Sequence, residues 1–409
     1  MNIKVLINAY ACSPDMGSEP GMAWNWCANL AKHCELYIIT EGEFRDKIEA
    51  ALPTLPQGIN MHFYYNPVTE EIRKMCWNQG DWRFYKHYRK WQWKTYQLAL
   101  DIIKTHHIDI IHQLNMIGFR EPGYLWKIKD IPFIWGPVDA KEKFPTAYLK
   151  GAPIKAQQFI RLKNFITKLQ LRYSKRVHET TQRASFVISA SSESKKTFKK
   201  YFNIDSPLIN ETGCDTSSIN HNNKPPKETF DLLWVGKMDF RKQLTLAIQT
   251  IAKIDNPHIK LHIVGGGNSQ MYQEKSQKLN VNKQCIWYGS ISHSEVQTLM
   301  QKSDLLFFTS VAEGTPHVVL EAIANGLPVI CFDICGQGDS IDSKSGIKIP
   351  LSNQQQSITD FASAIKSLYN NRNKLDELAQ GCKIRCNELS WENKALQMVE
   401  LYNRVLKNK

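Results

Sequence analysis

Several features of familiar protein classes are missing from this sequence. Its 409 residues contain no apolar run near the roughly 20 residues that a membrane-spanning helix needs. There is no long low-complexity or charge-block tract, and charged residues make up 22% of the chain. This composition predicts a folded protein that does not cross a membrane. The opening residues, MNIKVLINAY, predict a buried strand rather than a charged leader, so we expect no export and a cytoplasmic location.

Metal and cofactor motifs are also missing. The ten cysteines include no C-x-x-C pair, which favours buried, reduced thiols over disulfides or zinc ligands. No D-x-D occurs, and no His, Cys and carboxylate cluster has metal-ligand spacing, so we expect no tightly bound metal. Neither G-x-G-x-x-G nor a Walker loop is present, so neither a dinucleotide cofactor nor ATP is indicated.

The length and the strand pattern favour two α/β domains. A chain of 409 residues is too long for one core of ordinary size. Short apolar runs alternate with helical segments in both halves, and several runs lack the alternation of a half-exposed strand. The expected strands are 4–10, 35–40, 61–65, 109–114, 132–135, 186–189, 231–236, 260–264, 286–289, 305–309 and 328–332. The polar stretch Ser217–Glu228 is typical of a linker, so we expect domains over 1–210 and 211–390, with a helix at about 391–409 packing back on the first.

The net charge of +13 is unevenly distributed. Residues 1–210 hold 30 Lys and Arg against 19 Asp and Glu, whereas the remainder holds 22 against 20. Residues 143–178 contain nine basic and no acidic residues, with apolar residues at helical spacing, and a second basic stretch, 73–94, is interleaved with tryptophans. Either these segments form a surface for an anionic membrane, or their apolar stripes pack on the first domain's core. The sequence leaves both open.

Two segments follow expected strands, where ligands bind in open α/β sheets. In ACSPDMGSEPGMAWNW, Gly17 and Gly21 flank Ser18 and Glu19 just before a helix. Glycines there let backbone N–H groups approach a phosphate or a sugar. The alternative is an ordinary strand-to-helix turn, and spacing alone does not separate the two readings.

The second segment is TSVAEGTPHVVLEAIANGLPVI, residues 309–330. Thr315 is expected to cap a helix that begins at Pro316, runs to about Asn325 and stops at Gly326. Glu321 lies in a nearly all-apolar run, where a carboxylate needs a hydrogen-bonding partner such as the vicinal hydroxyls of a ligand. The alternative is that Glu321 faces solvent or pairs with a basic neighbour.

In this segment, EGTPHVVLEAIANGLPVI resembles the signature of glycosyltransferase family 4 and its GT-B relatives. LLWVGKMDFRKQLTLAIQTI, LHIVGGG and WYGSISHSEVQTLMQKSDLLFFTS resemble the family's preceding elements in order and spacing, and NAYACSPDMGSEPG and FIWGPVDAKEKFP resemble a bacterial branch. The resemblance implies a GT-B fold, with two doubly wound Rossmann-like domains facing a central cleft. It also implies transfer of a sugar from a nucleotide-diphosphate sugar to a glycan or lipid-linked acceptor, with retention of anomeric configuration, in cell-surface polysaccharide biosynthesis (O-antigen, capsule or lipopolysaccharide).

The same resemblance implies roles for individual residues. Glu313 would contact the donor sugar hydroxyls and Glu321 the nucleotide ribose. Lys237 and Lys242 would neutralise the donor diphosphate, where fixed cations stabilise the charge that grows as the sugar departs. The remaining donor-binding positions are Gly17, Gly314, Thr315, His317 and Val318.

The sequence also departs from the family pattern. Position 237 is Lys where Arg is usual, which replaces a bidentate fork by a point charge. Gln243 stands where Gly often follows the second basic residue. The histidine that many members carry after the strand in PFIWGPVDA is absent; Glu19 and Asp139 could replace it, although a surface carboxylate is the preferred interpretation of each.

Three other functions remain open. A GT-B epimerase would share the nucleotide site, and a non-catalytic partner subunit would explain the missing histidine. A nucleic-acid-binding module would explain the basic charge but would leave the carboxylates at 313 and 321 unused, so we do not expect a nucleic-acid partner.

Overall fold

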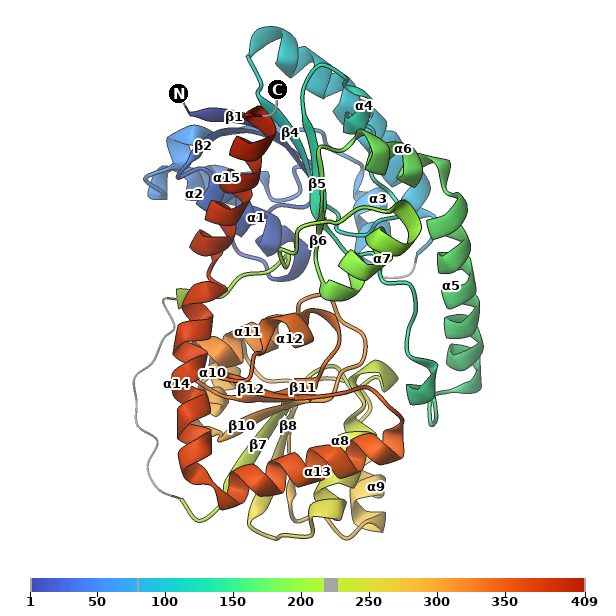
Figure 1. The fold of residues 1–409 in the computed structure, drawn as a ribbon, viewed down its shortest axis with the longest axis vertical. Helices are drawn as coiled ribbons and strands as arrows, with labels where there is room; N and C mark the ends of the chain where they lie inside the picture. The colour runs from blue at the N-terminus through green and yellow to red at the C-terminus, as the bar shows by residue number, and fades with distance from the viewer. Residues whose placement is uncertain (1, 79–80, 217–226, 408–409) are drawn as a thin grey trace. The chain divides into compact units, whose positions relative to one another are not determined.

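The computed structural model describes residues 2–78, 81–216 and 227–407 and divides the chain into two compact units (Figure 1). Unit 1 comprises Met1–Glu142, Lys168–Glu211 and Trp391–Lys409. Unit 2 comprises Lys143–Thr167 and Thr212–Ser390. Most of the expected linker, 217–226, lies outside the described residues. Within the described parts of the chain, no helix is long and apolar enough to cross a membrane.

Unit 1 is built on one parallel six-stranded sheet. Its strands, in order across the sheet, are β3 (Met61–Tyr65), β2 (Cys34–Thr40), β1 (Ile3–Ala9), β4 (Ile110–Asn115), β5 (Phe133–Val138) and β6 (Phe186–Ser189). One face packs on α1 (Ser18–Leu30), α2 (Arg45–Ala51) and α15 (Trp391–Lys407). The other face packs on α3 (Glu70–Trp77), α4 (Phe84–Thr105), α6 (Lys175–Arg183) and α7 (Ser192–Phe202). Burial on both faces explains why these strands carry continuous apolar runs.

Unit 2 repeats this plan. Its parallel strands, in order, are β12 (Gly346–Ile349), β11 (Val329–Phe332), β10 (Leu305–Phe308), β7 (Phe230–Val235), β8 (Ile259–Val264) and β9 (Cys285–Gly289). One face packs on α8 (Leu244–Ile254), α9 (Gln270–Lys278) and α13 (Gln354–Asn370). The other packs on α10 (His293–Lys302), α11 (His317–Ala324) and part of α14 (Arg372–Glu388). Read from the β9 edge, the order is the 3-2-1-4-5-6 of a Rossmann fold, as in unit 1.

The predicted fold class, two Rossmann-like α/β domains, is therefore confirmed. The strand that sequence reasoning missed is β12, whose four residues, GIKI, include a lysine at the edge of the sheet. A short edge strand lacks the apolar run that marks a central strand.

The expected domain boundary needs one correction, because residues 143–167 belong to unit 2 rather than to the first domain. Tyr148 is the reason: its ring is buried in the unit 2 core. Its hydroxyl bonds to the hydroxyl of Ser357 at 2.7 Å and accepts the backbone N–H of Ser352. The side-chain amide of Gln243 donates to the Tyr148 carbonyl at 2.9 Å. One aromatic anchor thus fixes a segment far away in the sequence.

Helix α15 lies in unit 1, where Tyr402 is fully buried. The Tyr402 hydroxyl lies 2.6 Å from Nδ1 of His112, whose Nε2 lies 2.6 Å from the Gly136 carbonyl oxygen. Burial lowers the pKa of His112 to about 4, so its ring is neutral at pH 7. His112 is a core residue with both ring nitrogens satisfied, not a catalytic base.

Gln243 offers a test of local strain, because its φ of 53° and ψ of 39° are left-handed. Gln243→Ala and Gln243→Gly both remove the bond to Tyr148, but only alanine keeps a side chain in this conformation. We expect Gln243→Ala to be the less stable of the two by about 1 kcal/mol in free energy of unfolding, measured by urea denaturation. Equal stabilities would contradict a strained position.

Candidate active site

The centre of the site in unit 2 is an ion pair between Lys242 and Glu313. Lys242 ends a short turn between β7 and α8, and Glu313 lies in the loop after β10. The Lys242 Nζ is 2.6 Å from the Glu313 Oε1, and the two side chains are only 16% and 19% exposed. The Ser310 hydroxyl donates to the same carboxylate oxygen. The chain thus brings together a cation and a carboxylate that the sequence analysis assigned to the donor diphosphate and the donor sugar.

The stem of Lys242 is held by its surroundings. A Cβ on Gly236 would approach the Lys242 side chain to 3.3 Å, and the Lys242 Nζ lies 5.2 Å from the centre of the Phe308 ring. The Thr309 hydroxyl donates to the Lys242 carbonyl at 2.7 Å. The ammonium group therefore has a defined position rather than the freedom of a surface lysine.

The neighbouring cations differ from Lys242. Lys237 is exposed and makes no ion pair among the residues that the structure describes. Arg241 pairs with Asp239 at 2.7 Å. Lys237 is thus a cation on the same loop that remains available to an anionic ligand.

Helix α11 begins at His317, and Pro316 is its N-cap with an extended backbone. The predicted cap, Thr315, and the predicted first helical residue, Pro316, are therefore each wrong by one residue. The helix ends at Ala324, one residue before the predicted end, and Gly326, which was predicted to stop it, has a left-handed conformation with a φ of 64°.

The loop that carries Gly314 and Thr315 is in close contact with α12 (Cys335–Ser340). The backbone N–H of Gly336 donates to the Gly314 carbonyl at 3.0 Å. A Cβ on Gly336 would lie 2.6 Å from the Cα of Thr315, so only glycine permits this approach. The loop before α11 is therefore tightly positioned.

Glu321, on α11, is less buried than its apolar neighbours suggested. Its side chain is 32% exposed, and its Oε1 lies 3.3 Å from Nε2 of His293, the first residue of α10. The alternative of pairing with a basic neighbour is thus observed, and an exposed pair of this kind leaves the carboxylate accessible. Sequence reasoning missed His293, because nothing local links residues 28 positions apart.

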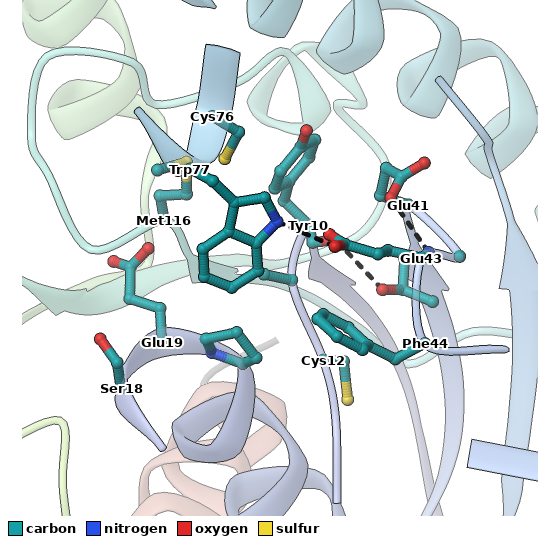
Figure 2. A pocket seen from close by; sticks show the side chains of 14 residues that line it. Tyr10, Cys12, Ser18, Glu19, Glu41, Glu43, Phe44, Cys76, Trp77 and Met116 are labelled. Atoms are coloured by element: carbon teal, nitrogen blue, oxygen red, sulfur yellow. Dashed lines mark hydrogen bonds between the residues drawn. The ribbon is translucent and has the colours of Figure 1, made fainter. Parts of the chain in front are cut away.

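Unit 1 contains a pocket at the carboxyl ends of β1 and β2, with a volume of about 240 Å³ (Figure 2). It is lined by Tyr10, Ala11, Cys12, Ser18, Glu19, Pro20, Thr40, Glu41, Gly42, Glu43, Phe44, Cys76, Trp77 and Met116. In the view of Figure 2, the Trp77 indole lies between the carboxylates of Glu19 and Glu43. Its Nε1 donates to Glu43 at 2.8 Å, while Glu41 is held by Arg73 at 2.9 Å. The pocket therefore combines aromatic surface with carboxylates.

Glu19 corrects another expectation. It lines this pocket instead of being a surface carboxylate, and its Oε1 accepts the backbone N–H of Ile117 at 3.0 Å. Burial, and secondarily the charge of Glu211, raise the pKa of Glu19 to about 7. Burial also raises the pKa of Glu43. Asp139, the other candidate, accepts from the Ser194 hydroxyl at 3.2 Å and does not line the pocket.

The two glycines before α1 have different reasons to be glycine. A Cβ on Gly21 would lie 1.9 Å from the Met16 carbonyl oxygen, so packing requires glycine there. Gly17 has an ordinary φ of −83° and nothing within 4 Å of a Cβ. The fold does not require glycine at position 17, which leaves open space beside the pocket residues Ser18 and Glu19.

No metal site accompanies these groups: in the part of the chain that the structure describes, no three His, Cys, Asp or Glu side chains are grouped to hold an ion. The groups at this site are fixed cations, carboxylates and the amino-terminal end of α11, where the helix dipole is positive. Such groups can bind a phosphorylated, hydroxyl-rich ligand.

Two Rossmann-like domains of this kind define the GT-B architecture. The solved structure of Anabaena HepE in complex with UDP has a TM-score of 0.63 and 15% identity over 98% of this chain and 100% of that chain, which shows the shared fold. Residues 215–384 match the family model described as Glycosyl transferases group 1.

Two curated relatives match over shorter regions. Glycogen synthase of Mycobacterium tuberculosis H37Rv is 24% identical over 184 residues, 44% of this chain and 44% of that protein. Lipopolysaccharide 1,6-galactosyltransferase of Escherichia coli K12 is 31% identical over 120 residues, 28% of this chain and 33% of that protein. The match spans less than half the length of either relative.

The raised pKa of Glu19 predicts a specific dependence of stability on pH. The folded carboxyl, with a pKa of about 7, holds a proton that the unfolded chain loses near the ordinary value of 4.5. Its contribution to stability is therefore largest below pH 4.5 and falls as the pH rises to 7, by about 3 kcal/mol at most. We expect the Tm of wild type to fall more than that of Glu19→Gln between pH 5 and pH 8. Parallel Tm profiles would contradict the raised pKa of Glu19.

Proposed function

We propose that this protein is a retaining glycosyltransferase of family 4 that transfers a sugar from a nucleotide-diphosphate sugar to a glycan or lipid-linked acceptor. The observation that carries the proposal is the Lys242–Glu313 pair beside the start of α11. It offers a fixed cation for a leaving phosphate and a fixed carboxylate for sugar hydroxyls, and fixed charges are most effective where charge develops. The family match of residues 215–384 supports the same reading.

The donor diphosphate binds Lys242, Lys237 and the backbone N–H groups at the start of α11, near His317 and Val318. Gly314 and Thr315 shape the loop around it. Glu313 binds sugar hydroxyls, with its carboxylate oriented by Ser310 and, before the donor arrives, by Lys242. Glu321 binds the ribose hydroxyls, since an ionised carboxylate accepts from both members of a diol. No metal is required, because lysines and helix N–H groups neutralise the phosphates.

The proposed donor and acceptor rest on two other observations. HepE was solved with UDP, so a uridine diphosphate sugar is the first donor to test. The pocket of unit 1, with the Trp77 indole and the Glu19 and Glu43 carboxylates, suits a sugar acceptor, whose hydroxyls donate to carboxylates while its apolar face contacts an indole. The partial match to a lipopolysaccharide galactosyltransferase supports a role in cell-surface polysaccharide biosynthesis.

The deciding experiment measures thermal shifts with UDP-, GDP- and ADP-sugars, followed by product analysis of the best donor with and without glycan acceptors. Transfer with a retained anomeric configuration is expected. An inverted linkage would contradict retention, a changed donor without acceptor would indicate an epimerase, and no shift with any donor would favour a non-catalytic module.

Glu321→Ala should weaken donor binding about 10- to 100-fold in calorimetry, because it removes charge-assisted hydrogen bonds to the ribose. The matched control is His293→Ala, which removes the hydrogen bond to Glu321 but leaves the carboxylate and should change the donor affinity little. If both variants lose affinity equally, the contact with His293 rather than a ribose contact explains the effect.

Lys242→Met should lower kcat by roughly 10²–10³ and weaken donor binding less, because the cation acts on charge that develops at the leaving phosphate. The neighbouring Arg241→Met removes a cation already paired with Asp239 and serves as the control. An effect of Lys242→Met confined to the KM of the acceptor would place Lys242 outside the donor site.

Gly17→Ala should leave Tm unchanged, because a Cβ there meets no atom within 4 Å. If the open space admits substrate, kcat/KM should fall about tenfold or more, since small displacements of a reacting group are costly. Unchanged kcat/KM would place the substrate elsewhere.

A further inference from the structure

Helix α5 (Ile154–Tyr173) differs from an ordinary surface helix in the side that faces solvent, because most of its apolar side chains are exposed. Its buried side chains are few and partly polar: Ile160, Thr167 and Leu171. Six apolar side chains are instead between 41 and 67% exposed, and we call them the outer face of α5: Phe159, Leu162, Phe165, Ile166, Leu169 and Tyr173. At about 100° per residue, these six fall on the side opposite the buried three. The helix thus presents its more apolar side to solvent.

This exposure contradicts one of the two interpretations of segment 143–178, namely that its apolar stripe packs on a domain core. Packing on a domain core accounts for Ile160 and Leu171 but is wrong for the outer face, whose side chains are exposed. A contiguous apolar surface of this kind on a folded protein marks an interaction site.

The charge around the outer face indicates the kind of partner. Arg161, Lys168 and Arg172 follow one edge of the apolar stripe and Lys163 follows the other, and all four are exposed. No acidic residue occurs from position 143 to 178. A second copy of the chain would set basic edges against each other, and a polynucleotide would leave the apolar side chains in water. An anionic bilayer surface matches both the apolar stripe and its basic edges.

The second basic stretch does not form a comparable surface. Trp91 is buried against Tyr10, and Trp77 lines the unit 1 pocket. Trp82 and Trp93 are exposed, at 80% and 45%. The tryptophans of this stretch therefore do not share one role, and α5 carries the argument alone.

We propose that the outer face of α5 docks on a membrane carrying anionic lipids, with the helix parallel to the surface. The 20 residues span about 30 Å along the plane. Phe159, Leu162 and Phe165 enter the boundary between head groups and acyl chains, while the flanking lysines and arginines contact lipid phosphates. This inference stands apart from the proposed sugar transfer, since it rests on α5 and not on the donor site.

The test is co-sedimentation of the full chain with vesicles of phosphatidylcholine, alone or with 30% phosphatidylglycerol (about one lipid in three, enough for a negative surface). We expect wild type to bind the anionic vesicles at least about tenfold more tightly at low salt, and high salt to reduce this preference. Absence of binding to anionic vesicles at low salt would overturn the proposal.

Three variants separate the contributions. The apolar variant carries Phe159→Gln, Leu162→Gln, Phe165→Gln and Leu169→Gln; the basic variant carries Lys155→Gln, Arg161→Gln, Lys163→Gln and Lys168→Gln. Each should lose about tenfold or more in vesicle affinity. The charge-matched control changes four exposed lysines of unit 2 that lie outside α5, at Lys278, Lys283, Lys302 and Lys366, and should bind within about twofold of wild type. Equal binding by all three would exclude α5 as the contact.

Two further measurements keep the result interpretable. Hydrogen exchange of wild-type residues 154–173 should slow when anionic vesicles are added, which requires no variant. Unchanged exchange in vesicle-bound protein would place the contact elsewhere. Sedimentation without lipid tests the second-copy alternative: a dimer that the apolar variant abolishes, in protein that ignores vesicles, would overturn membrane docking. Donor binding measured on the same variants should be unchanged, so failure here is distinguishable from failure of the proposed transfer.

Discussion

Both units depend on one constraint, which is that a parallel sheet has two apolar faces and both must be covered. In unit 2 this divides a single strand between two cores, with Leu232 and Trp234 in one cluster and Leu233 in the other. Most side chains on these faces are apolar, and the charged groups of the candidate sites lie where strands end. Lys242 and Glu313 follow the ends of β7 and β10, and Glu19 and Glu43 lie at the carboxyl end of the unit 1 sheet. The position of each candidate site is therefore a consequence of covering the sheets.

The Lys242–Glu313 pair shows how such a site can be stable yet reactive. Two mostly buried charges are costly to desolvate and persist because each satisfies the other, with Ser310 completing the carboxylate's bonds. Removing one partner leaves an uncompensated charge, so the pair positions both groups before any ligand arrives. A diphosphate that binds Lys242 would compete with Glu313 for the ammonium group and would release carboxylate oxygens for hydroxyl donors. In the proposed function, preorganisation of one charge by the other would bring the donor phosphate and the donor sugar together in one small region.

In residues 1–210, the acidic side chains of the unit 1 pocket and the basic side chains of α5 lie on different surfaces. The unit 1 pocket is lined by Glu19, Glu41 and Glu43, and burial keeps the pKa of Glu19 near 7. A neutral carboxyl can donate a hydrogen bond as well as accept one, which an ionised carboxylate cannot do. The basic residues of α5, in contrast, are exposed at the edges of an apolar stripe. The two surfaces therefore suit different ligands: the pocket suits hydroxyl groups, and the helix suits lipid phosphates.

What the sequence determined was local. Apolar runs in the sequence predicted the central strands. The start and the end of α11 were also predictable, with an error of one residue at Pro316. Both kinds of signal arise from residues within a few positions of each other. The tertiary structure decided what depends on distant partners. Residues 143–167 belong to unit 2 because Tyr148 contacts Gln243 and Ser357. Gln243 has a left-handed conformation at a position where glycine is usual. His293 contacts Glu321, Glu19 lines the unit 1 pocket, and the outer face of α5 is exposed. A periodic pattern reveals that a helix has an apolar side, but only the packing of the other elements determines whether that side is covered.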